Sequence, residues 1–370
     1  MSGLITAYEV LRIIESHGFR AFLVGGAVRD IVMGKIPSDY DIATSASPYK
    51  IKEIFSSFKQ YLSGERYKTV GVIFKGTNFE ITTFREESGY GDHRHPDVTS
   101  ASNINSDVLR RDFTINAIYM DKNGEIFDPL LGKEDIKKRL IRAVGNADER
   151  FSEDALRILR AVRFASALCF KIESETALAM RRCAPLIKNI SKERITEELK
   201  KAVAGEAFFE VLSNFSDVFF TATGDLPLFS DKEKAAFKLL TADEKFYFFL
   251  SKLTTGLNRL ALSSRQKKTA AFLHKYLNAE TIRLSQLFYE DEFSANVFLK
   301  IKKACGEEII LPDYFIYKIK DLAVNGNDLD INPKLKGKAL KEALFAVADG
   351  RLLNDREKIL EFIRLLYIDK

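Results

Sequence analysis

The chain has 370 residues, of which 46% are hydrophobic and 29% are charged, and its formal net charge is +5. This length and composition support large cores and two to four domains of a soluble protein. No apolar run reaches the roughly 18 residues that a membrane span needs, and Glu9 and Glu15 interrupt what could otherwise be a signal sequence. We therefore expect a cytoplasmic protein without a membrane contact. The three cysteines are too few and too scattered for a disulfide framework or a zinc cluster.

The predicted elements change in kind along the chain. Residues 5–18 have the pattern of a helix that ends at Gly18. Short β-branched or aromatic runs bounded by turn residues then predict strands, at residues 21–26, 40–44, 70–76, 79–85, 117–121 and 125–129. From about residue 151 almost to the C-terminus, apolar residues recur at helical spacing. The sequence thus predicts an α/β or α+β head up to about residue 145, followed by a helical remainder.

The first chemical signal is a pair of glycines followed by two aspartates. Gly25 and Gly26 end an apolar strand where a helix begins, and the missing side chains let backbone amides approach an anion. Asp39 and Asp41 flank one tyrosine, so they emerge on the same side of a strand. Carboxylate oxygens are the ligands that magnesium prefers, together with substrate phosphates. Glycines that cradle a triphosphate beside aspartates that bind Mg²⁺ predict a nucleotide site, to which Arg29 could add a phosphate contact.

Three further features lie between this motif and the helical part. Glu80 interrupts an apolar strand, so it either lies near the metal and acts on the attacking hydroxyl or occupies the wet face of the strand. Residues 85–98 have no core pattern and predict a mobile surface loop, in which two histidines without a third ligand do not indicate a metal site. Arg111 is a candidate clamp for a triphosphate because a guanidinium fork matches phosphate geometry.

The stretch at residues 152–164 suggests how a base could be read. On one helix, Asp154, Arg157 and Arg160 would fall at steps of three, and Arg163 extends this stripe. Ordinary helix ion pairs would explain any single pair, but three arginines in one line are less usual. A carboxylate can accept from an exocyclic amine while a guanidinium donates to a ring acceptor. Cytosine and adenine share that edge pattern, so one Asp/Arg pair could accept C or A and reject U or G.

Two stretches are rich in cations. Residues 251–275 contain six lysines and arginines and no acidic residue, whereas residues 181–201 are basic but interrupted by glutamates. They are either solvated helix faces or a surface that follows a phosphate backbone. A net charge as mild as this one does not by itself indicate a polyanionic partner.

Five of these stretches, in this order, closely resemble the class II tRNA nucleotidyltransferases, the bacterial and eukaryotic CCA-adding enzymes, which are related to bacterial poly(A) polymerases. They are "LVGGAVRD" (23–30), "SDYDIAT" (38–44), "RRDFTINA" (110–117), "EDALRILRAVRF" (153–164) and "ERITEELKK" (193–201). The resemblance covers about residues 20–200. The stretches "LAVNGNDLD" and "GKALKEALFAVADGRLLND" near the C-terminus also resemble the tail of such enzymes from Gram-positive bacteria. Residues 210–310 show no resemblance that we recognise.

The resemblance implies an α+β fold with a nucleotidyltransferase palm, a mixed sheet with helices, followed by all-α neck, body and tail domains. It implies a head at residues 1–145, a neck with the base-template helix at 146–205, an RNA-binding body at 206–310 and a tRNA-binding tail at 311–370. These helical domains would hold the acceptor arm and 3′ end of tRNA. No obligate protein partner is implied.

The resemblance also assigns roles to residues. Asp39 and Asp41 would bind two catalytic Mg²⁺ ions, with the role of Glu80 left open. Contacts to the nucleotide map onto Gly26, Arg29, Arg111, Asp154, Arg157, Arg160 and Arg163. Gly25 is added to this set because it belongs to the glycine pair described above. The reaction would be in-line attack of the tRNA 3′-hydroxyl on the α-phosphate of CTP or ATP, with release of pyrophosphate. One metal ion would activate the hydroxyl and the other would stabilise the leaving oxygens.

Several neighbouring activities remain open. Enzymes that add only CC lack part of the loop that corresponds to residues 86–98, and this loop looks complete here. Bacterial poly(A) polymerases carry an arginine-rich segment where this chain has residues 66–76, which makes poly(A) synthesis a second choice. Enzymes that add only A keep the loop and are harder to exclude. A catalytically inactive RNA-binding protein is the remote alternative, because both aspartates and the arginine stripe are intact.

Overall fold

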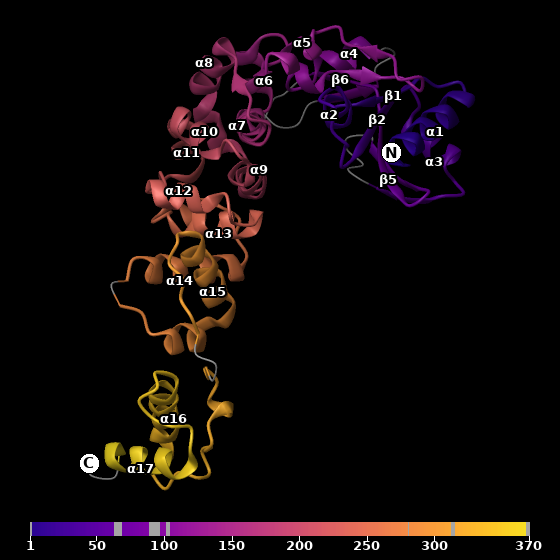
Figure 1. The fold of residues 1–370 in the computed structure, drawn as a ribbon. Helices are drawn as coiled ribbons and strands as arrows, with labels where there is room; N and C mark the ends of the chain where they lie inside the picture. The colour runs from indigo at the N-terminus through magenta and orange to yellow at the C-terminus, as the bar shows by residue number, and fades with distance from the viewer. Residues whose placement is uncertain are drawn as a thin grey trace. The chain divides into compact units, whose positions relative to one another are not determined.

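The computed structural model describes residues 2–62, 69–88, 97–100, 104–279, 281–311 and 315–367. The chain forms two compact units, Met1–Leu226 and Pro227–Lys370 (Figure 1). The first unit contains the sheet and the helices that follow it, and the second is helical. An α+β fold with a helical remainder is therefore confirmed, while the four domain boundaries expected from the resemblance stay a prediction.

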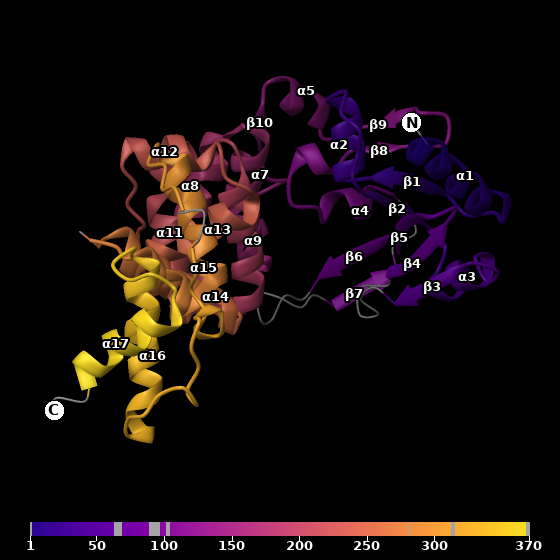
Figure 2. The ribbon, with the colours of Figure 1, turned by 60° about the horizontal axis from the view of Figure 1, so that its bottom comes forward.

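One mixed sheet organises the first part of the chain (Figure 2). Seven strands of the described residues follow the order β3-β4-β5-β2-β1-β8-β9. β2 and β5 are parallel, and the other neighbours are antiparallel. The strands are β1 (Ala21–Val24), β2 (Tyr40–Thr44), β3 (Lys59–Leu62), β4 (Thr69–Phe74), β5 (Thr77–Thr83), β8 (Tyr119–Met120) and β9 (Ile126–Phe127). All six predicted strands are present, and β3 is an addition.

Five helices accompany these strands: α1 (Ser2–Ser16), α2 (Gly26–Val32), α3 (Pro48–Ile54), α4 (Ile104–Leu109) and α5 (Gly132–Lys137). α1 packs on β1 and β2, and α3 packs on β4 and β5. In α1, Ala7, Leu11 and Ile14 are fully buried at a spacing of one helical turn. The helix ends as predicted before Gly18, whose φ of 85° is in the left-handed region.

The prediction of a surface loop at residues 85–98 is partly wrong. β6 (Arg85–Ser88) and β7 (Asp97–Ser100) form a two-stranded antiparallel ribbon, with Arg85 opposite Ser100. Polar composition hid these strands because a ribbon outside the main sheet needs no alternating apolar pattern. The stretch between them, at residues 89–96, lies outside the described residues, and so do both histidines and most of the loop used to weigh CC-only addition.

The rest of the first unit is helical apart from one short strand pair. β10 (Leu140–Ile141) pairs in parallel with β11 (Lys171–Ile172). The helices are α6 (Ala147–Glu153), α7 (Leu156–Leu168), α8 (Ser174–Cys183), α9 (Lys192–Ala204), α10 (Phe208–Asn214) and α11 (Ser216–Thr223). α7 packs closely against α9 and carries fully buried Ile158 and Ala161 on its inner face.

The second unit consists of α12 (Asp231–Phe237), α13 (Ala242–Ser251), α14 (Ser264–Leu277), α15 (Leu284–Ala304), α16 (Pro333–Ala348) and α17 (Arg356–Tyr367). The first three begin with capping boxes, for example Ser230 with Glu233, in which each residue satisfies a backbone N–H of the other. α16 and α17 share a small core with Leu344, Ile359 and Ile363 at its centre.

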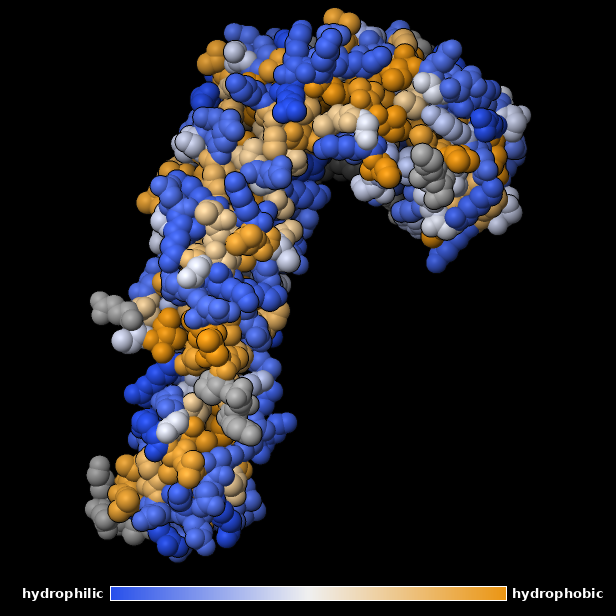
Figure 3. All heavy atoms as spheres, viewed as in Figure 1, coloured by the Kyte–Doolittle hydropathy of each residue, from blue (hydrophilic) through white to orange (hydrophobic). Residues whose placement is uncertain are grey.

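The surface is mixed in character. The face drawn in Figure 3 is mostly hydrophilic, with apolar residues in separate patches. Among the described residues, none of the helices combines the length and the apolar character that crossing a membrane requires.

A hydrophobic cluster at the centre of the sheet positions the candidate site. Val24 of β1, Ala43 of β2 and Tyr119 of β8 belong to it, together with Phe84 and Val108. Val24 and Ala43 also line a pocket together with Asp41, the register partner of Val24 on the same face of the sheet. The floor of the pocket is therefore fixed by close-packed core residues, which hold the polar side chains around it at defined positions.

Candidate functional site

The glycine turn after β1 lies against two charged side chains. Gly25 has φ 65° and ψ −132°, a backbone conformation that only glycine adopts readily, and α2 begins at the next residue. A Cβ atom at Gly25 would lie 3.4 Å from Arg111 Nη1 and 3.9 Å from Asp41 Oδ2. Glycine at this position therefore leaves room between a guanidinium and a carboxylate, as the sequence led us to expect for a ligand site.

Two carboxylates stand side by side on the sheet. Asp41 of β2 is the register partner of Glu80 in the parallel strand β5 and of Val24 in β1. Register partners point to the same face, so Asp41 and Glu80 are neighbours on the solvent side of the sheet. Glu80 occupies the wet face of β5 and lies beside Asp41, and its action on the attacking hydroxyl stays a prediction. Asp39 precedes β2, is exposed and accepts a hydrogen bond from Ser38 Oγ at 3.0 Å.

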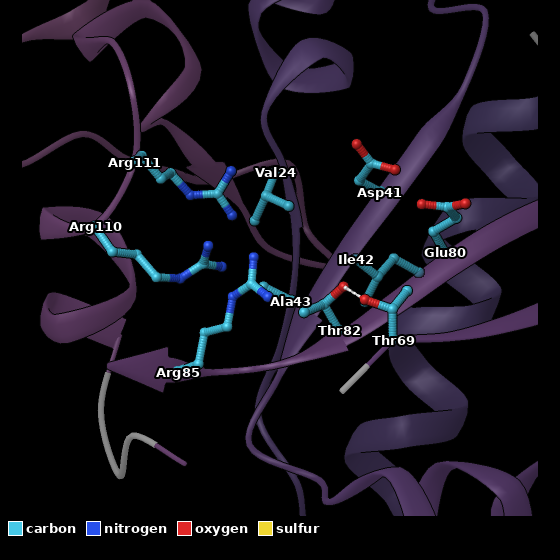
Figure 4. A pocket seen from close by; sticks show the side chains of 10 residues that line it. All are labelled: Val24, Asp41, Ile42, Ala43, Thr69, Glu80, Thr82, Arg85, Arg110 and Arg111. Carbon is cyan, nitrogen blue, oxygen red and sulfur yellow. Dashed lines mark hydrogen bonds between the residues drawn. The ribbon is translucent and has the colours of Figure 1, made fainter. Parts of the chain in front are cut away.

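These carboxylates form one wall of a cavity of about 410 Å³ (Figure 4). We call Asp41 and Glu80 the carboxylate wall. Arg85, Arg110 and Arg111 lie across the cavity with their guanidinium groups gathered together, and we call them the cationic wall. The remaining lining residues are Val24, Ile42, Ala43, Thr69 and Thr82. A space with anionic ligands for a metal on one side and guanidinium donors on the other suits a metal-bound polyphosphate.

The charges around Asp41 shift its ionisation. Asp41 carries exposed surface but lies deep in the concave site, and this burial raises its pKa from 3.8 to about 6. The negative charges of Glu80 and Asp39 act in the same direction, while Arg111 partly offsets them. Because the ionised form of Asp41 is disfavoured, a cation that binds next to it stabilises this carboxylate.

The cationic wall is held from behind by one buried carboxylate. Asp107 of α4 has no exposed surface and accepts hydrogen bonds from Arg110 Nε at 2.9 Å, Arg110 Nη2 at 2.7 Å and Arg111 Nη2 at 3.1 Å. Tyr119 OH donates to Asp107 Oδ2 at 2.6 Å and accepts from Arg111 Nε at 2.7 Å. Burial alone would raise the pKa of Asp107, but the two arginines outweigh it and lower the pKa.

Three of the predicted nucleotide contacts gather at another place. The guanidinium groups of Arg29, Arg160 and Arg163 lie 5.4, 5.3 and 4.3 Å from the centre of the Phe164 ring. Arg29 is buried and also donates to Asn116 Oδ1 at 2.9 Å. The structure thus brings these three arginines together around α7, but they are not among the residues that line the pocket with Asp41.

Acidic residues fix two of these arginines. Arg160 Nη2 lies 2.7 Å from Asp112 Oδ2, and Arg163 Nη1 lies 3.1 Å from Glu198 Oε1 on α9. Burial would raise the pKa of Asp112, but the charge and the hydrogen bond of Arg160 act in the opposite direction. The pKa of Asp112 is lowered to about 2. Since Asp112 directly follows Arg111, this ion pair connects the cationic wall to α7.

The proposed base-reading pair lies where α6 meets α7, and one part of its prediction is wrong. Asp154 is not on a helix shared with Arg157: it caps α6 with extended backbone angles, and its Oδ1 accepts from Leu156 N at 3.1 Å. An aspartate that bonds the backbone two residues on favours such a turn over a continuous helix. Asp154 Oδ2 also lies 2.8 Å from Arg194 Nη2 on α9.

Arg157 is buried and occupied by other groups. Its Nη1 lies 2.7 Å from Glu153 Oε2 and 3.0 Å from the Arg150 carbonyl, and its Nη2 donates to the Arg110 carbonyl at 3.0 Å. Asp154 and Arg157 are therefore neighbours along the chain, each held by other partners, and their role with a base stays a prediction.

Several residues that build the site were not identified from the sequence. Asp107, Tyr119 and Phe164 touch the predicted arginines, and Asp112 and Glu198 pair with them. Asp107 and Phe164 had local signals, because Asp107 lies three and four positions before Arg110 and Arg111, and Phe164 lies four positions after Arg160 on α7. The ion pairs of Asp112 and Glu198 join distant segments and have no such spacing.

The basic stretches also acquire acidic neighbours. In residues 251–275, Lys252 lies 2.5 Å from Glu233, and both Arg265 and Lys268 lie within 3.0 Å of Asp291. In residues 181–201, Arg182 and Arg194 pair with aspartates. Most of these pairs are partly exposed, so each contributes little stability and leaves its cation accessible to water.

Comparison with known proteins supports the class of protein that this fold and site define. The family described as poly A polymerase head domain matches residues 21–142, which span the sheet and the pocket. A second family, described as the probable RNA and SrmB-binding site of polymerase A, matches residues 169–214. The fold and site are those of a nucleotidyltransferase.

Comparison with named relatives identifies the family within this class. The CCA-adding enzyme of Staphylococcus saprophyticus is 34% identical over 97% of this chain and 98% of its own length, and that of Ligilactobacillus salivarius is 35% identical over 98% and 97%. An alignment with the Lactobacillus helveticus CCA-adding enzyme is 46% identical and spans 62% of this chain and 57% of that protein. The crystal structure of the Bacillus stearothermophilus CCA-adding enzyme in complex with CTP has a TM-score of 0.80 and 30% identity, covering 98% of this chain and 96% of that one. The chain belongs to the family of CCA-adding enzymes, whose members use divalent metal ions.

Proposed function

We propose that this protein adds the sequence CCA to the 3′ end of tRNA, using CTP and ATP and releasing pyrophosphate. The observation that carries the proposal is the pocket between the carboxylate wall and the cationic wall, at the end of a glycine turn. The relatives named CCA-adding enzymes over the whole length of the chain support the product, and the CTP complex of a 30% identical relative supports one substrate.

The residues present fit a divalent metal. Among the described residues, no group of three or more histidine, cysteine, aspartate or glutamate side chains forms a metal cage. Mg²⁺ does not need one, because it is usually bound by one or two carboxylates, several waters and substrate phosphates. Asp41 and Asp39 supply such carboxylates. The pKa of Asp41 is raised by burial and then by the charges of Glu80 and Asp39, so a bound cation would stabilise its ionised form. We therefore assign Mg²⁺ to this pair.

The chain's own residues account for positioning in the reaction. The metal, when bound, would activate the 3′-hydroxyl and offset charge on the phosphates. Arg111 and Arg110 present fork-shaped donors to the triphosphate and stabilise the charge that gathers on pyrophosphate as it leaves. Gly25 lets the phosphates pass between these donors and Asp41. Glu80, next to Asp41, is placed to orient the attacking hydroxyl.

Base selection would involve the junction of α6 and α7. Asp154 and Arg157 offer an acceptor and donors that match the shared edge of cytosine and adenine. Both side chains have partners in this structure, so binding of a nucleotide would have to exchange Arg194 or Glu153 for the base. Arg29, Arg160 and Arg163 would add contacts to the nucleotide from the cluster around Phe164.

The helical parts of the chain provide the surface for tRNA. We assign the acceptor arm to the neck, body and tail at residues 146–205, 206–310 and 311–370. The basic stretches at residues 181–201 and 251–275 belong to the neck and the body. Because tRNA and both nucleotides are present in the cytoplasm, the protein would work there. No protein partner is required for this reaction.

The experiment that tests the function uses magnesium and three tRNA transcripts that end at the discriminator base, at C and at CC. Each is offered CTP, ATP or both, and the products are resolved to single nucleotides. Addition of CC and one A to the shortest transcript is expected. Activity only on the transcript that ends in CC would make the protein an A-adding enzyme, and a ladder of A residues would make it a poly(A) polymerase.

A variant ties this activity to the site. Asp41→Ala should abolish addition while tRNA binding is largely kept, because it removes a metal ligand and no tRNA contact. Asp231→Ala is the control, since this carboxylate is almost fully exposed at the start of α12, in the second unit. Full activity of Asp41→Ala would refute the metal assignment, and loss of activity in both variants would mean that the effect is not specific to the site.

A further inference from the structure

The two walls of the pocket carry opposite charges at short range. A single Cβ-sized space at Gly25 touches both Arg111 Nη1 and Asp41 Oδ2. The positive charge of Arg111 already lowers the pKa of Asp41 against the effect of burial. Arginine side chains are long and flexible, so an unrestrained guanidinium would move onto the opposite carboxylate and occupy the space where phosphate and metal must bind.

Asp107 opposes this closure. It lies behind the cationic wall, fully buried, and takes three hydrogen bonds from Arg110 and Arg111. The backbone N–H of Arg85 donates to Asp107 Oδ1 as well, at 3.3 Å, so the carboxylate also fixes the start of β6. Each of the three members of the cationic wall is thereby attached to one side chain that does not itself line the pocket.

Tyr119 holds the guanidinium of Arg111 in one orientation. Its hydroxyl accepts from Arg111 Nε while donating to Asp107 Oδ2, and the Arg111 guanidinium lies 4.9 Å from the centre of its ring. Arg111 Nη1 also donates to the Asn116 carbonyl at 3.3 Å. Because Tyr119 belongs to a buried hydrophobic cluster, these contacts anchor the guanidinium to close-packed core residues.

We infer that Asp107 is a positioning residue that holds Arg110 and Arg111 on the cationic wall, apart from the carboxylates of the opposite wall. The inference rests on the proposed function, since it assigns these arginines to the triphosphate. Asp107 does not touch the nucleotide. It keeps the guanidinium groups ready for phosphate and keeps the carboxylate wall open for the metal.

If Asp107 positions the arginines, its neutralisation weakens polyphosphate binding. The loss of its negative charge alone would strengthen that binding, so the two explanations predict opposite changes in affinity. Asp107→Asn replaces a charged acceptor by an amide of the same shape, so one oxygen position becomes a donor that faces other donors. Binding of inorganic tripolyphosphate to the full chain in Mg²⁺, measured by calorimetry, should weaken by about tenfold or more. If Asp107 acted only through its negative charge near an anion, its neutralisation would instead tighten binding, and that result would overturn the inference.

A matched variant controls for loss of stability. Asp135 is also a buried aspartate of the first unit, bonded to Thr114 and paired with Arg142, but it does not line the pocket. Asp135→Asn should lower thermal stability and leave the affinity for tripolyphosphate unchanged. If both variants lose stability and neither loses affinity, Asp107 is merely structural and the inference fails.

Tyr119→Phe tests the same restraint even where Asp107→Asn does not fold. It keeps the ring and its packing and removes only the hydroxyl that joins Arg111 to Asp107. We expect weaker tripolyphosphate binding, with tRNA affinity and the preference for C and A over U and G unchanged. Unchanged tripolyphosphate affinity in this variant would contradict the inference.

A double-mutant cycle shows whether Asp107 acts through Arg111. If it does, Asp107→Asn should weaken tripolyphosphate binding by a much smaller factor in an Arg111→Ala background than in the parent chain. Equal factors in both backgrounds would overturn the assignment. Failure of the proposed function is seen separately, because it would appear as absence of nucleotide addition by the parent chain whatever the binding data show.

Discussion

At the scale of single residues, the site depends on charges that are unfavourable without a ligand. The folded protein holds Asp41 with a pKa near 6, against 3.8 as its ordinary value. The metal-free folded state therefore binds a proton more tightly than the unfolded chain does, and its stability falls as pH rises from about 4 to about 6. Asp112, with its pKa lowered to about 2, has the opposite effect: it stabilises the fold at neutral pH and loses that contribution only in strong acid.

Asp41→Asn should consequently stabilise the metal-free protein. In EDTA at pH 7.5 we expect the variant to have a higher Tm than the parent, because a carboxylate that burial and Glu80 disfavour is replaced by a neutral amide. The gain should shrink as the pH is lowered toward 4.5. Thermal unfolding across this pH range measures both effects.

Magnesium provides the internal control for this prediction. Added Mg²⁺ should raise the Tm of the parent more than that of Asp41→Asn, since binding to the folded state alone stabilises it. An Asp41→Asn protein that is less stable than the parent at pH 7.5 in EDTA would show that the ionised carboxylate does not destabilise the metal-free fold.

Gly25→Ala should damage both stability and nucleotide binding. An alanine at φ 65° and ψ −132° costs about 1–3 kcal/mol of backbone strain, and its Cβ would lie 3.4 Å from Arg111 Nη1. Gly76→Ala is a matched control, because Gly76 has φ 77° but nothing within 4 Å of the added atom. Both variants should lose Tm, while only Gly25→Ala should bind CTP more weakly in a calorimetric titration. Equal CTP affinities would contradict the role of the turn.

At the scale of elements, α7 connects the pocket with the proposed base-reading residues. Its Arg157 donates to the Arg110 carbonyl at the end of α4, and its Arg160 pairs with Asp112. One ion pair and one hydrogen bond to the backbone thus join the helix that would select the base to the segment that would bind the phosphates. We expect selection and phosphate binding to be separable nevertheless, because different side chains perform them.

Arg157→Ala should weaken discrimination against UTP and GTP more than it weakens tRNA binding. Loss of a good pair of hydrogen bonds to a base costs about 1–3 kcal/mol of discrimination, or roughly tenfold or more. Single-turnover incorporation of the four nucleotides on a CC-ended transcript measures the effect. Arg182→Ala is the control, since Arg182 is exposed and pairs with Asp148 away from the pocket. Relative incorporation that matches the parent would refute the base-reading role.

Prediction of the elements succeeded where the pattern was local. The strand at residues 40–44 is buried except at Asp41, β5 alternates between buried and more exposed positions, and the helical neighbour α1 has a single buried stripe. The ribbon of β6 and β7 was missed because its sequence, apart from Val98, is polar and has no apolar alternation. The helix expected to include Asp154 was too long, because the aspartate side chain competes for the backbone N–H of Leu156.

At the scale of the whole molecule, every predicted site residue lies in the first compact unit, Met1–Leu226. A fragment of residues 1–226 should therefore fold and bind CTP in Mg²⁺ with an affinity close to that of the full chain. Its affinity for tRNA should be much lower, because it lacks the basic stretch at residues 251–275. Calorimetry with CTP and filter binding with tRNA measure the two quantities.

Salt titration gives the same experiment a second readout. The affinity of the full chain for tRNA should fall with added salt, and the slope should be smaller for the fragment, which makes fewer phosphate contacts. A fragment with unchanged tRNA affinity and slope would show that the second unit does not contribute to RNA binding.

The sequence by itself determined the features that depend on neighbours in the chain. These are the strand and helix pattern, the glycine turn, and the pairing of Asp39 with Asp41, because periodicity and turn chemistry are set within a few residues. It also carried the five motifs from which the family was recognised, and the comparisons confirmed that family.

Only the tertiary structure decided which of these residues meet. Glu80 joins Asp41 because β2 and β5 are parallel partners, and Asp107 reaches Tyr119 because α4 and β8 contribute to one hydrophobic cluster. It also separated the predicted arginines: Arg111 lines the pocket, Arg157 is held at the junction of α6 and α7, and the other three surround Phe164. Such contacts join segments distant in sequence, and their energies come from packing, burial and charge in three dimensions, which no local pattern records.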